Sequence, residues 1–569
     1  MYYFICKVLD DNDGAKKFSM SAQARSDPNC VYAQLESGLV CGRTLQADDG
    51  SWYASFRGVP YAKPPIGPLR FKELEPLEPW NGVYDARYEG PVCHQTDVFY
   101  IEIMRPQYMS EDCIHANIHV PLEALLHPST VKDFTPPSPN DQYEATEQQG
   151  LPILVFIHGG GFGFGSGDTD LYGPEFLVTK KMIVITFNYR LNVVGFLSLN
   201  TAQVPGNAGL RDMVTLLRWV QRNARAFGGD PDNVTLGGQS AGAISAHLLT
   251  LSKATKGLFK RTIMMSGTAT SNLYSPSPFF AKFIQSKFLQ LLAINDTDPD
   301  LIYQQLVELP VEKLNEANSY LLDQFGLTTF VPTVETPFPG VTTILDDYPE
   351  ILIAKGRGKD IPLLVGYTNV ECETFRKRFE NPIIIVPPKT LFAVQPSLLP
   401  DVAKKIDVRY YNGTINVDGF IKSCTDGFFE YPVWKLMQSR DKRDAAMYVY
   451  KFSYNSDDTV FKKVSDFPLK YYGAGHVDDM TYVFKVNSVL GAGPINNEDN
   501  DMKDYMLNIF DNFINCRQPD CDELWASANS NDLLYKDIYN PNTLKNQVKG
   551  ISSYQKQMIK FFDSLTMVE

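Results

Sequence analysis

The chain has no run of about 20 apolar residues, the length that a helix needs to cross a bilayer, although 44% of its 569 residues are hydrophobic. Basic residues are not in excess either. The chain has 53 Lys and Arg residues and 66 Asp and Glu residues, which gives a formal net charge of −13. A membrane-spanning segment is therefore not predicted, and neither nucleic acid nor an anionic membrane is expected as the main partner.

Paired metal-binding cysteines are also missing. None of the nine cysteines forms a C-x-x-C motif, so no metal site is predicted, and the sequence implies no cofactor. Cys93 and Cys113 bracket one loop and could close it as a disulfide. The pairing of the other seven stays open at this stage: Cys6, Cys30, Cys41, Cys372, Cys424, Cys516 and Cys521.

The N-terminus lacks the features of an ordinary signal peptide. Residues 1–9 are apolar, but polar and acidic residues follow at once without a small-residue cleavage site. Residues 1–28 are expected to be a polar, poorly ordered leader. Two sequons, at Asn295 and Asn412, are predicted surface glycosylation sites. Together with the candidate disulfide they favour a secreted protein, with a cytoplasmic location as the alternative.

Strand and helix patterns alternate along the chain. Residues 151–157 and 182–187 are continuous apolar runs, typical of strands buried on both faces of a parallel sheet. Residues 210–227 show helical periodicity. Short strands or hairpins are expected at 31–43 and 52–60. Further strands are expected at 114–120, 262–265, 361–366 and 447–452, and further helices at 279–292, 501–515 and 553–565. This alternation predicts an α/β fold, with one domain over residues 29–565 and an exposed insertion at 136–150.

A glycine-flanked serine lies between a strand and a helix. The apolar run 234–236 leads into Gly238-Gln239-Ser240-Ala241-Gly242, and an Ala/Leu-rich helical pattern follows. This is the context of a nucleophile elbow. Small residues are needed there because a Cβ two positions before or after the serine would clash with the neighbouring strand or helix. Ser240 is the predicted nucleophile.

A serine hydroxyl needs a base, a group that orients the base, and donors for the developing oxyanion. The predicted strand 151–157 runs into a glycine loop, His158-Gly-Gly-Gly161. We expect the N–H groups of Gly160, Gly161 and Ala241 to bind the oxyanion. A phosphate-binding loop is disfavoured because no G-K-[ST] sequence follows.

The base must come from seven histidines. In the chain order serine, acid, histidine, only His476 qualifies, whereas His158 and His247 are expected to be structural. The acid should follow a strand between serine and histidine. Spacing after strand 361–366 leaves Glu371 and Glu373 open and favours the former.

These features resemble the type-B carboxylesterase family, the carboxylesterase and cholinesterase branch of the α/β hydrolases. The likeness covers roughly residues 30–560 and is carried by Phe56–Phe71, Ser110–Cys113, His158–Phe162, Asn207–Asp212, Gly238–Gly242 and Gly475–Asp478. The resemblance implies a twisted, mostly parallel sheet flanked by helices, with long loop insertions over the active site. It identifies Glu371 as the acid through the spacing from Gly366. It also implies a Cys93–Cys113 disulfide and two buried ion pairs, Arg70 with Glu111 and Arg190 with Asp212.

The sequence departs from the family pattern in ways that bear on substrate. Gln239 precedes the serine where most members have glutamate, which is similar to insect juvenile hormone esterases and other insect carboxylesterases. Cys372 follows the acid in place of the usual glycine. The loop 93–113 contains no tryptophan, the residue with which cholinesterases hold quaternary ammonium groups. A neutral residue beside the serine lowers the attraction for cationic substrates.

The sequence therefore predicts a serine carboxylesterase acting on small, neutral, apolar esters. A more specific juvenile hormone or odorant esterase is the narrower alternative, and a non-catalytic adhesion homologue is the alternative outside enzymes. The oligomeric state is left open.

Overall fold

The computed structural model describes residues 30–96, 108–125, 150–325, 328–379, 396–463, 471–521, 525–542 and 547–566. The predicted leader, Cys6 and nearly all of the predicted insertion at 136–150 lie outside these ranges. The division into a leader and one domain over 29–565 therefore stays a prediction.

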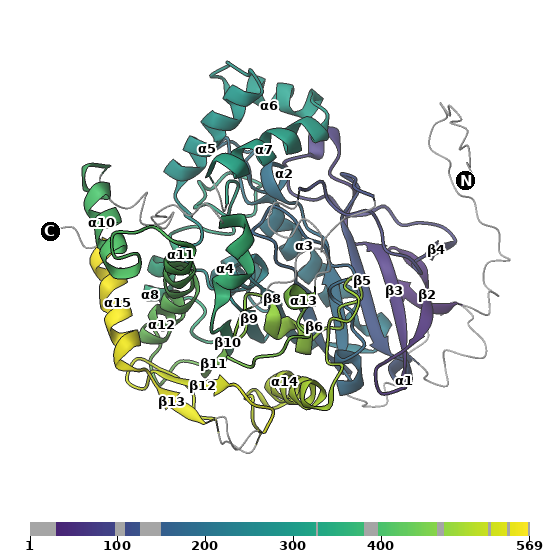
Figure 1. Cartoon of the computed structure of the whole chain (residues 1–569). Coiled ribbons are helices and arrows are strands. Elements are labelled where there is room, and N and C mark those ends of the chain that lie inside the picture. Colours follow the sequence, from purple (N-terminus) through teal and green to yellow (C-terminus); the bar gives the residue numbers. More distant parts are fainter. Residues whose placement is uncertain are drawn as a thin grey trace, which may run out of the picture.

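Within the described residues, 13 strands form one mixed sheet in the order β1-β2-β3-β5-β7-β6-β8-β9-β10-β11-β12-β13, with β4 paired to β2 (Figure 1). The strands are β1 (Val31–Leu35), β2 (Gly38–Gln46), β3 (Trp52–Pro60), β4 (Val83–Asp85), β5 (His115–Pro121), β6 (Leu151–Ile157), β7 (Ile183–Phe187), β8 (Gly229–Gln239), β9 (Arg261–Met265), β10 (Leu363–Thr368), β11 (Met447–Phe452), β12 (Leu534–Ile538) and β13 (Val548–Gly550).

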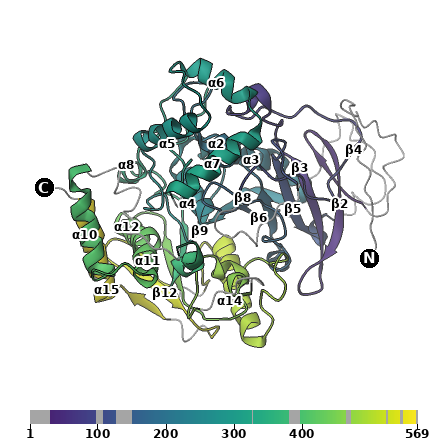
Figure 2. The ribbon, with the colours of Figure 1, turned by 45° about the horizontal axis from the view of Figure 1, so that its top comes forward.

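Helices connect most of these strands. They are α1 (Leu122–Leu125), α2 (Asn192–Phe196), α3 (Ala208–Asn223), α4 (Ala241–Leu251), α5 (Pro278–Leu291), α6 (Pro299–Glu308), α7 (Val311–Phe325), α8 (Pro349–Ala354), α10 (Leu399–Tyr410), α11 (Val417–Cys424), α12 (Tyr431–Gln438), α13 (Val460–Lys463), α14 (Asn497–Cys516) and α15 (Ser553–Thr566). Figures 1 and 2 place α5, α6 and α7 together at one end of the molecule, away from α14.

The centre of the sheet is parallel from β7 to β12, whereas its margins are antiparallel except for β4, which pairs in parallel with β2. Alternate residues of β6 enter two separate apolar clusters. Ile153 and Val155 pack in the cluster that includes α3 and α4, and Leu154 and Phe156 pack in the cluster that includes α14. Since successive side chains of a strand point to opposite faces, helices cover both faces of the sheet. The predicted α/β-hydrolase architecture is confirmed.

Most predicted boundaries shift by a few residues. The predicted helix 210–227 is α3 followed by a separate 3₁₀ turn, η4 (Ala224–Phe227), which ends at Gly228 with a left-handed φ of 74°. The predicted strand 361–366 is β10 and starts two residues later. The strand 447–452 coincides with β11.

The two ion pairs implied by the family resemblance are present. Arg190 contacts Asp212 through two side-chain nitrogens at 2.8 and 2.6 Å, and Arg70 contacts Glu111 at 2.6 and 2.8 Å. Arg190 and Asp212 are both buried. The first pair joins the segment after β7 to α3, and the second joins the loop after β3 to the segment before β5.

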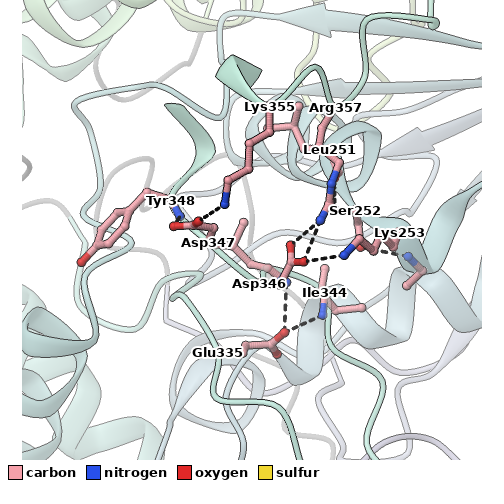
Figure 3. Close-up of polar contacts among 12 residues, drawn as sticks. Leu251, Ser252, Lys253, Glu335, Ile344, Asp346, Asp347, Tyr348, Lys355 and Arg357 are labelled. Atoms are coloured by element: carbon pink, nitrogen blue, oxygen red, sulfur yellow. Dashed lines mark hydrogen bonds and ion pairs between the residues drawn. The ribbon is translucent and has the colours of Figure 1, made fainter. Parts of the chain in front are cut away.

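A charged cluster holds the far end of α4 (Figure 3). Arg357 donates to the carbonyl of Leu251, the last residue of the helix, at 2.9 Å. Arg357 and Lys253 both pair with Asp346, at 2.6 and 3.2 Å. The helix that begins beside Ser240 is therefore anchored at its other end by the segments on either side of α8.

Candidate active site

The turn between β8 and α4 holds Ser240 in a strained backbone conformation. Its φ is +56° and its ψ is −123°, and its N–H donates to the carbonyl of Met265 at 2.8 Å. A Cβ on Gly238 would lie 2.4 Å from the backbone of Gly242, and one on Gly242 would lie 2.1 Å from the carbonyl oxygen of Ile157. Only glycine fits at both positions, so the sharp turn follows directly from the sequence.

The glycine loop after β6 lies against this turn. A Cβ on Gly159 would meet the Cβ of Ser240 at 3.1 Å. Gly160 and Gly161 have left-handed φ values of 109° and 59°. Among the described residues, the N–H groups of Gly160 and Gly161 donate to no acceptor. The N–H of Ala241 is the first of α4, where helix geometry provides no internal partner. These three donors are therefore free to bind an anionic oxygen.

Glu371 and His476 form a buried, directly bonded pair. The Nδ1 of His476 lies 2.6 Å from Oε2 of Glu371, and the His476 N–H donates to the Glu371 carbonyl at 2.9 Å. The other carboxylate oxygen accepts the N–H of Thr368, the last residue of β10, at 2.8 Å. Because Nδ1 donates to the carboxylate, Nε2 carries the lone pair that a general base needs.

The second glutamate left open by spacing has a different environment. Glu373 pairs with Arg376 at 2.7 Å. The structure therefore brings Glu371, and not Glu373, to the histidine. Spacing after the strand favoured Glu371 over Glu373, and the family resemblance identified Glu371 through its spacing from Gly366.

Gln239 touches the histidine directly, a contact that sequence reasoning missed. Its side-chain nitrogen lies 3.2 Å from Nε2 of His476. Within the described residues, the structure contains no hydrogen bond between the Ser240 hydroxyl and His476. The amide therefore occupies the Nε2 acceptor in this arrangement, and a neutral group contacts the base where a carboxylate would carry charge.

Aromatic rings surround the imidazole. The ring centroids of Phe429 and Phe375 lie 4.8 and 5.5 Å from that of His476. Phe162, in the glycine loop, packs 6.0 Å from Tyr274. Phe429 belongs to η8 (Thr425–Glu430), a segment for which no sequence pattern indicated a role in the site. The imidazole therefore has two phenylalanine neighbours in addition to Glu371 and Gln239.

The other histidines singled out by the sequence are structural, as expected. His158 is buried, donates from Nδ1 to the Gly159 carbonyl at 2.8 Å and stacks on Tyr189. Burial lowers its pKa to about 4. His247 accepts the N–H of Ala269 at 2.9 Å, and burial lowers its pKa to about 3. Both imidazoles are neutral at pH 7.

Two buried aspartates follow the histidine in η9 (Asp478–Tyr482). The Tyr450 hydroxyl donates to Oδ2 of Asp479 at 3.0 Å, while Oδ1 of Asp479 has no hydrogen-bond partner in the described part of the chain. Burial and the nearby Glu371 charge raise the pKa of Asp479 to about 7. A titratable carboxyl therefore lies behind the acid–histidine pair.

Four disulfides are present in the described residues. Cys93 pairs with Cys113, as the resemblance implied. Six of the cysteines whose pairing the sequence left open also form disulfides: Cys30 with Cys41, Cys372 with Cys424, and Cys516 with Cys521. No group of three metal-ligating side chains occurs in the described ranges. No helix in those ranges is both long and apolar enough to span a membrane.

Comparisons with known proteins agree with this geometry. A model of the carboxylesterase family matches residues 29–558. The juvenile hormone esterase of Heliothis virescens is 54% identical over 563 residues, covering 96% of each chain. The crystal structure of juvenile hormone esterase from Manduca sexta, with OTFP covalently attached, superposes with a TM-score of 0.87 at 51% identity, covering 94% of this chain and 99% of that one. A PNB esterase structure gives a TM-score of 0.74 at 27% identity, covering 93% and 99%.

Proposed function

Because the chain belongs to the carboxylesterase family and is a carboxylic ester hydrolase, we propose that it cleaves neutral, apolar esters through an acyl-enzyme formed on Ser240. Glu371, His476 and Ser240 are the proposed triad. The observation that carries this proposal is the buried 2.6 Å contact between Glu371 and the Nδ1 of His476, whose Nε2 contacts Gln239, the residue before Ser240.

In the proposed reaction, His476 accepts the Ser240 proton while the serine oxygen attacks the ester carbonyl. The Gln239 amide occupies Nε2 at rest, so the hydroxyl must take that position when the ester binds, as catalytic hydrogen bonds often tighten only with substrate. Glu371 keeps the imidazole oriented and stabilises the imidazolium.

The oxyanion is held by the N–H groups of Gly160, Gly161 and Ala241. Each such donor contributes on the order of 3 kcal/mol to transition-state stabilisation in comparable sites. His476 then protonates the leaving alcohol, and in the second half-reaction it activates water to release the acid. No metal or cofactor is required by this sequence of steps.

The preference for uncharged esters is supported by the neutral Gln239 and by the phenylalanines around His476. A narrower candidate is a juvenile hormone esterase. It is favoured by the 54% and 51% identity to two proteins that bear that name. A broad carboxylesterase and a specific juvenile hormone esterase can be told apart by ranking kcat/KM over a panel of short acetates, long-chain esters and a juvenile-hormone-like methyl ester. A broad enzyme hydrolyses all three classes, and a specific one favours the methyl ester by orders of magnitude.

Ser240→Ala tests the triad. Its kcat on a simple aryl ester should fall by at least about 10³-fold, since loss of the nucleophile leaves only binding and the oxyanion hole. Ser245→Ala is the matched control, because Ser245 is a buried serine on α4, one turn after Ser240, and its hydroxyl donates to the Ala241 carbonyl. Ordinary turnover by the Ser240 variant would refute the assignment. Stoichiometric labelling of the wild type by an organophosphate excludes a non-catalytic homologue.

Secretion is proposed on two observations. Four disulfides are typical of oxidising compartments, and Asn295 and Asn412 are exposed in the structure. A mobility shift on treatment with an N-glycosidase, lost in Asn295→Gln/Asn412→Gln, would support glycosylation at these sites.

A further inference from the structure

One disulfide begins at the residue that follows the proposed catalytic acid. Cys372 is joined to Cys424, the last residue of α11, and both cysteines are buried, with 0% and 2% exposure. The N–H of Cys372 donates to the hydroxyl of Thr425 at 3.2 Å. The acid-bearing segment η6 (Glu371–Phe379) is therefore bonded to the junction of α11 and η8 both covalently and through its backbone.

The two segments joined in this way contact the same imidazole. Glu371 opens η6 and holds Nδ1 of His476, and Phe375 of η6 packs on the ring. Phe429 of η8 packs on the ring with a centroid distance of 4.8 Å. His476 lies between the Glu371 carboxylate on η6 and the Phe429 ring on η8. If η6 separated from η8, these two groups would move relative to each other and to the imidazole.

Other links between these segments are weaker. Arg376 of η6 reaches Asp418 of α11 at 2.7 Å, but the two side chains are 38% and 83% exposed. Exposed ion pairs of this kind contribute little and are screened by salt. The covalent link is the one that water and salt do not weaken.

We propose that the Cys372–Cys424 disulfide is a positioning element of the active site, which fixes Glu371 and Phe429 on either side of His476. This proposal rests on the proposed triad. It assigns to the disulfide an effect on the acid–histidine geometry beyond the general stabilisation that a cross-link gives a fold. The disulfide itself touches neither substrate nor the reacting atoms.

The test compares Cys372→Ser/Cys424→Ser with Cys516→Ser/Cys521→Ser, which removes the exposed disulfide at the end of α14. In the first variant kcat should fall roughly 10- to 100-fold with little change in KM, because small displacements of catalytic groups reduce turnover by such factors. Its pH–kcat profile should shift. The downfield proton resonance of the His476–Glu371 hydrogen bond should broaden or move. The control should keep the wild-type kcat, profile and resonance.

If the serine double variant does not fold, Cys372→Ala/Cys424→Val replaces it, because apolar side chains suit the buried positions of both cysteines. Thr425→Val keeps the disulfide and removes only the acceptor of the Cys372 N–H, so its pH profile should stay that of the wild type. A wild-type pH profile and resonance in a folded cysteine double variant overturns the proposal. A shifted profile in Thr425→Val with the disulfide intact also overturns it, since the backbone hydrogen bond would then be the positioning element. If the proposed triad is wrong, Ser240→Ala will still turn over ester. If only the role of the disulfide is wrong, Ser240→Ala will be inactive and the cysteine double variant will behave like the wild type.

Discussion

Asp479 offers a quantitative check on the electrostatics behind the site. The carboxyl is fully buried, next to Glu371, with one oxygen bonded to Tyr450 and the other without a partner in the described residues. Its pKa is raised to about 7, compared with about 3.9 for an exposed aspartate. The folded protein therefore keeps a proton that the unfolded chain releases at lower pH.

The sign follows from this difference. A group whose folded-state pKa is raised contributes stability at low pH and loses that contribution as pH rises from about 4 to about 7. Between pH 5 and pH 8, ionisation of Asp479 lowers the free energy of unfolding by about 3 kcal/mol. For a chain of 569 residues, that corresponds to about 2–3 °C in Tm. Asp479→Asn cannot ionise and should not lose this contribution.

The assay is thermal unfolding of the wild type, Asp479→Asn and a control, Asp504→Asn, at pH 5, 6, 7 and 8, with fixed salt and scan rate. Asp504 is an exposed aspartate on α14. The amide at 479 can lower Tm at every pH, because its NH₂ group can be left without an acceptor, which costs about 1–3 kcal/mol. The test is therefore how the Tm difference between Asp479→Asn and the wild type changes with pH, and not the size of that difference at any one pH.

Relative to the wild type, the Tm of Asp479→Asn should rise by about 2–3 °C from pH 5 to pH 8. The Asp504 variant should stay parallel to the wild type. A Tm difference for Asp479→Asn that is constant across this range would refute the reasoning, since it would mean that Asp479 carries the same charge in the folded and the unfolded chain.

Further substitutions test the remaining parts of the site. In Gly160→Ala a Cβ would lie 2.0 Å from a carbonyl oxygen of the same loop at a φ of +109°, so kcat on an aryl ester should fall by about 100-fold or more, with circular dichroism as the check on folding. Arg190→Met leaves Asp212 buried and unpaired and should lower stability by about 3–5 kcal/mol, whereas Arg190→Met/Asp212→Leu should recover part of that loss in Tm. Gln239→Glu should raise kcat/KM for a choline ester relative to a neutral ester by about tenfold, because one nearby negative charge contributes about 1.4 kcal/mol. An unchanged ratio would show that residue 239 does not select substrates by charge.

The elements nearest the chemistry were the most predictable. β6, β8 and β10 each contain an apolar run that ends in a glycine turn or a short loop, and each pattern is local in the sequence. β8 also includes the mostly polar segment 229–233, which the sequence did not mark as part of a strand. Ser240 and the glycine loop follow from sterics, since a side chain in place of the flanking glycines would clash with backbone.

The contacts that the sequence did not reveal are all long-range. Phe429 reaches His476 from η8, and Gln239 reaches it from the end of β8. Neither contact has a local pattern, because each depends on how segments far apart in the chain pack. The pairing of seven cysteines was open for the same reason. Helices α10 and α11 lie in the long segment between β10 and β11. No strand pattern was recognised in this segment that would have marked where a helix begins or ends.

The Cys30–Cys41 disulfide lies at the outer edge of the sheet, where it joins the residue before β1 to β2. An edge strand that peels away exposes unpaired backbone groups of its neighbour, and such an edge is a template for pairing with another chain. A covalent bond at the start of β1 holds this strand in register against β2. The disulfide should therefore oppose edge-to-edge aggregation of the folded protein, a colloidal property separate from its catalytic activity.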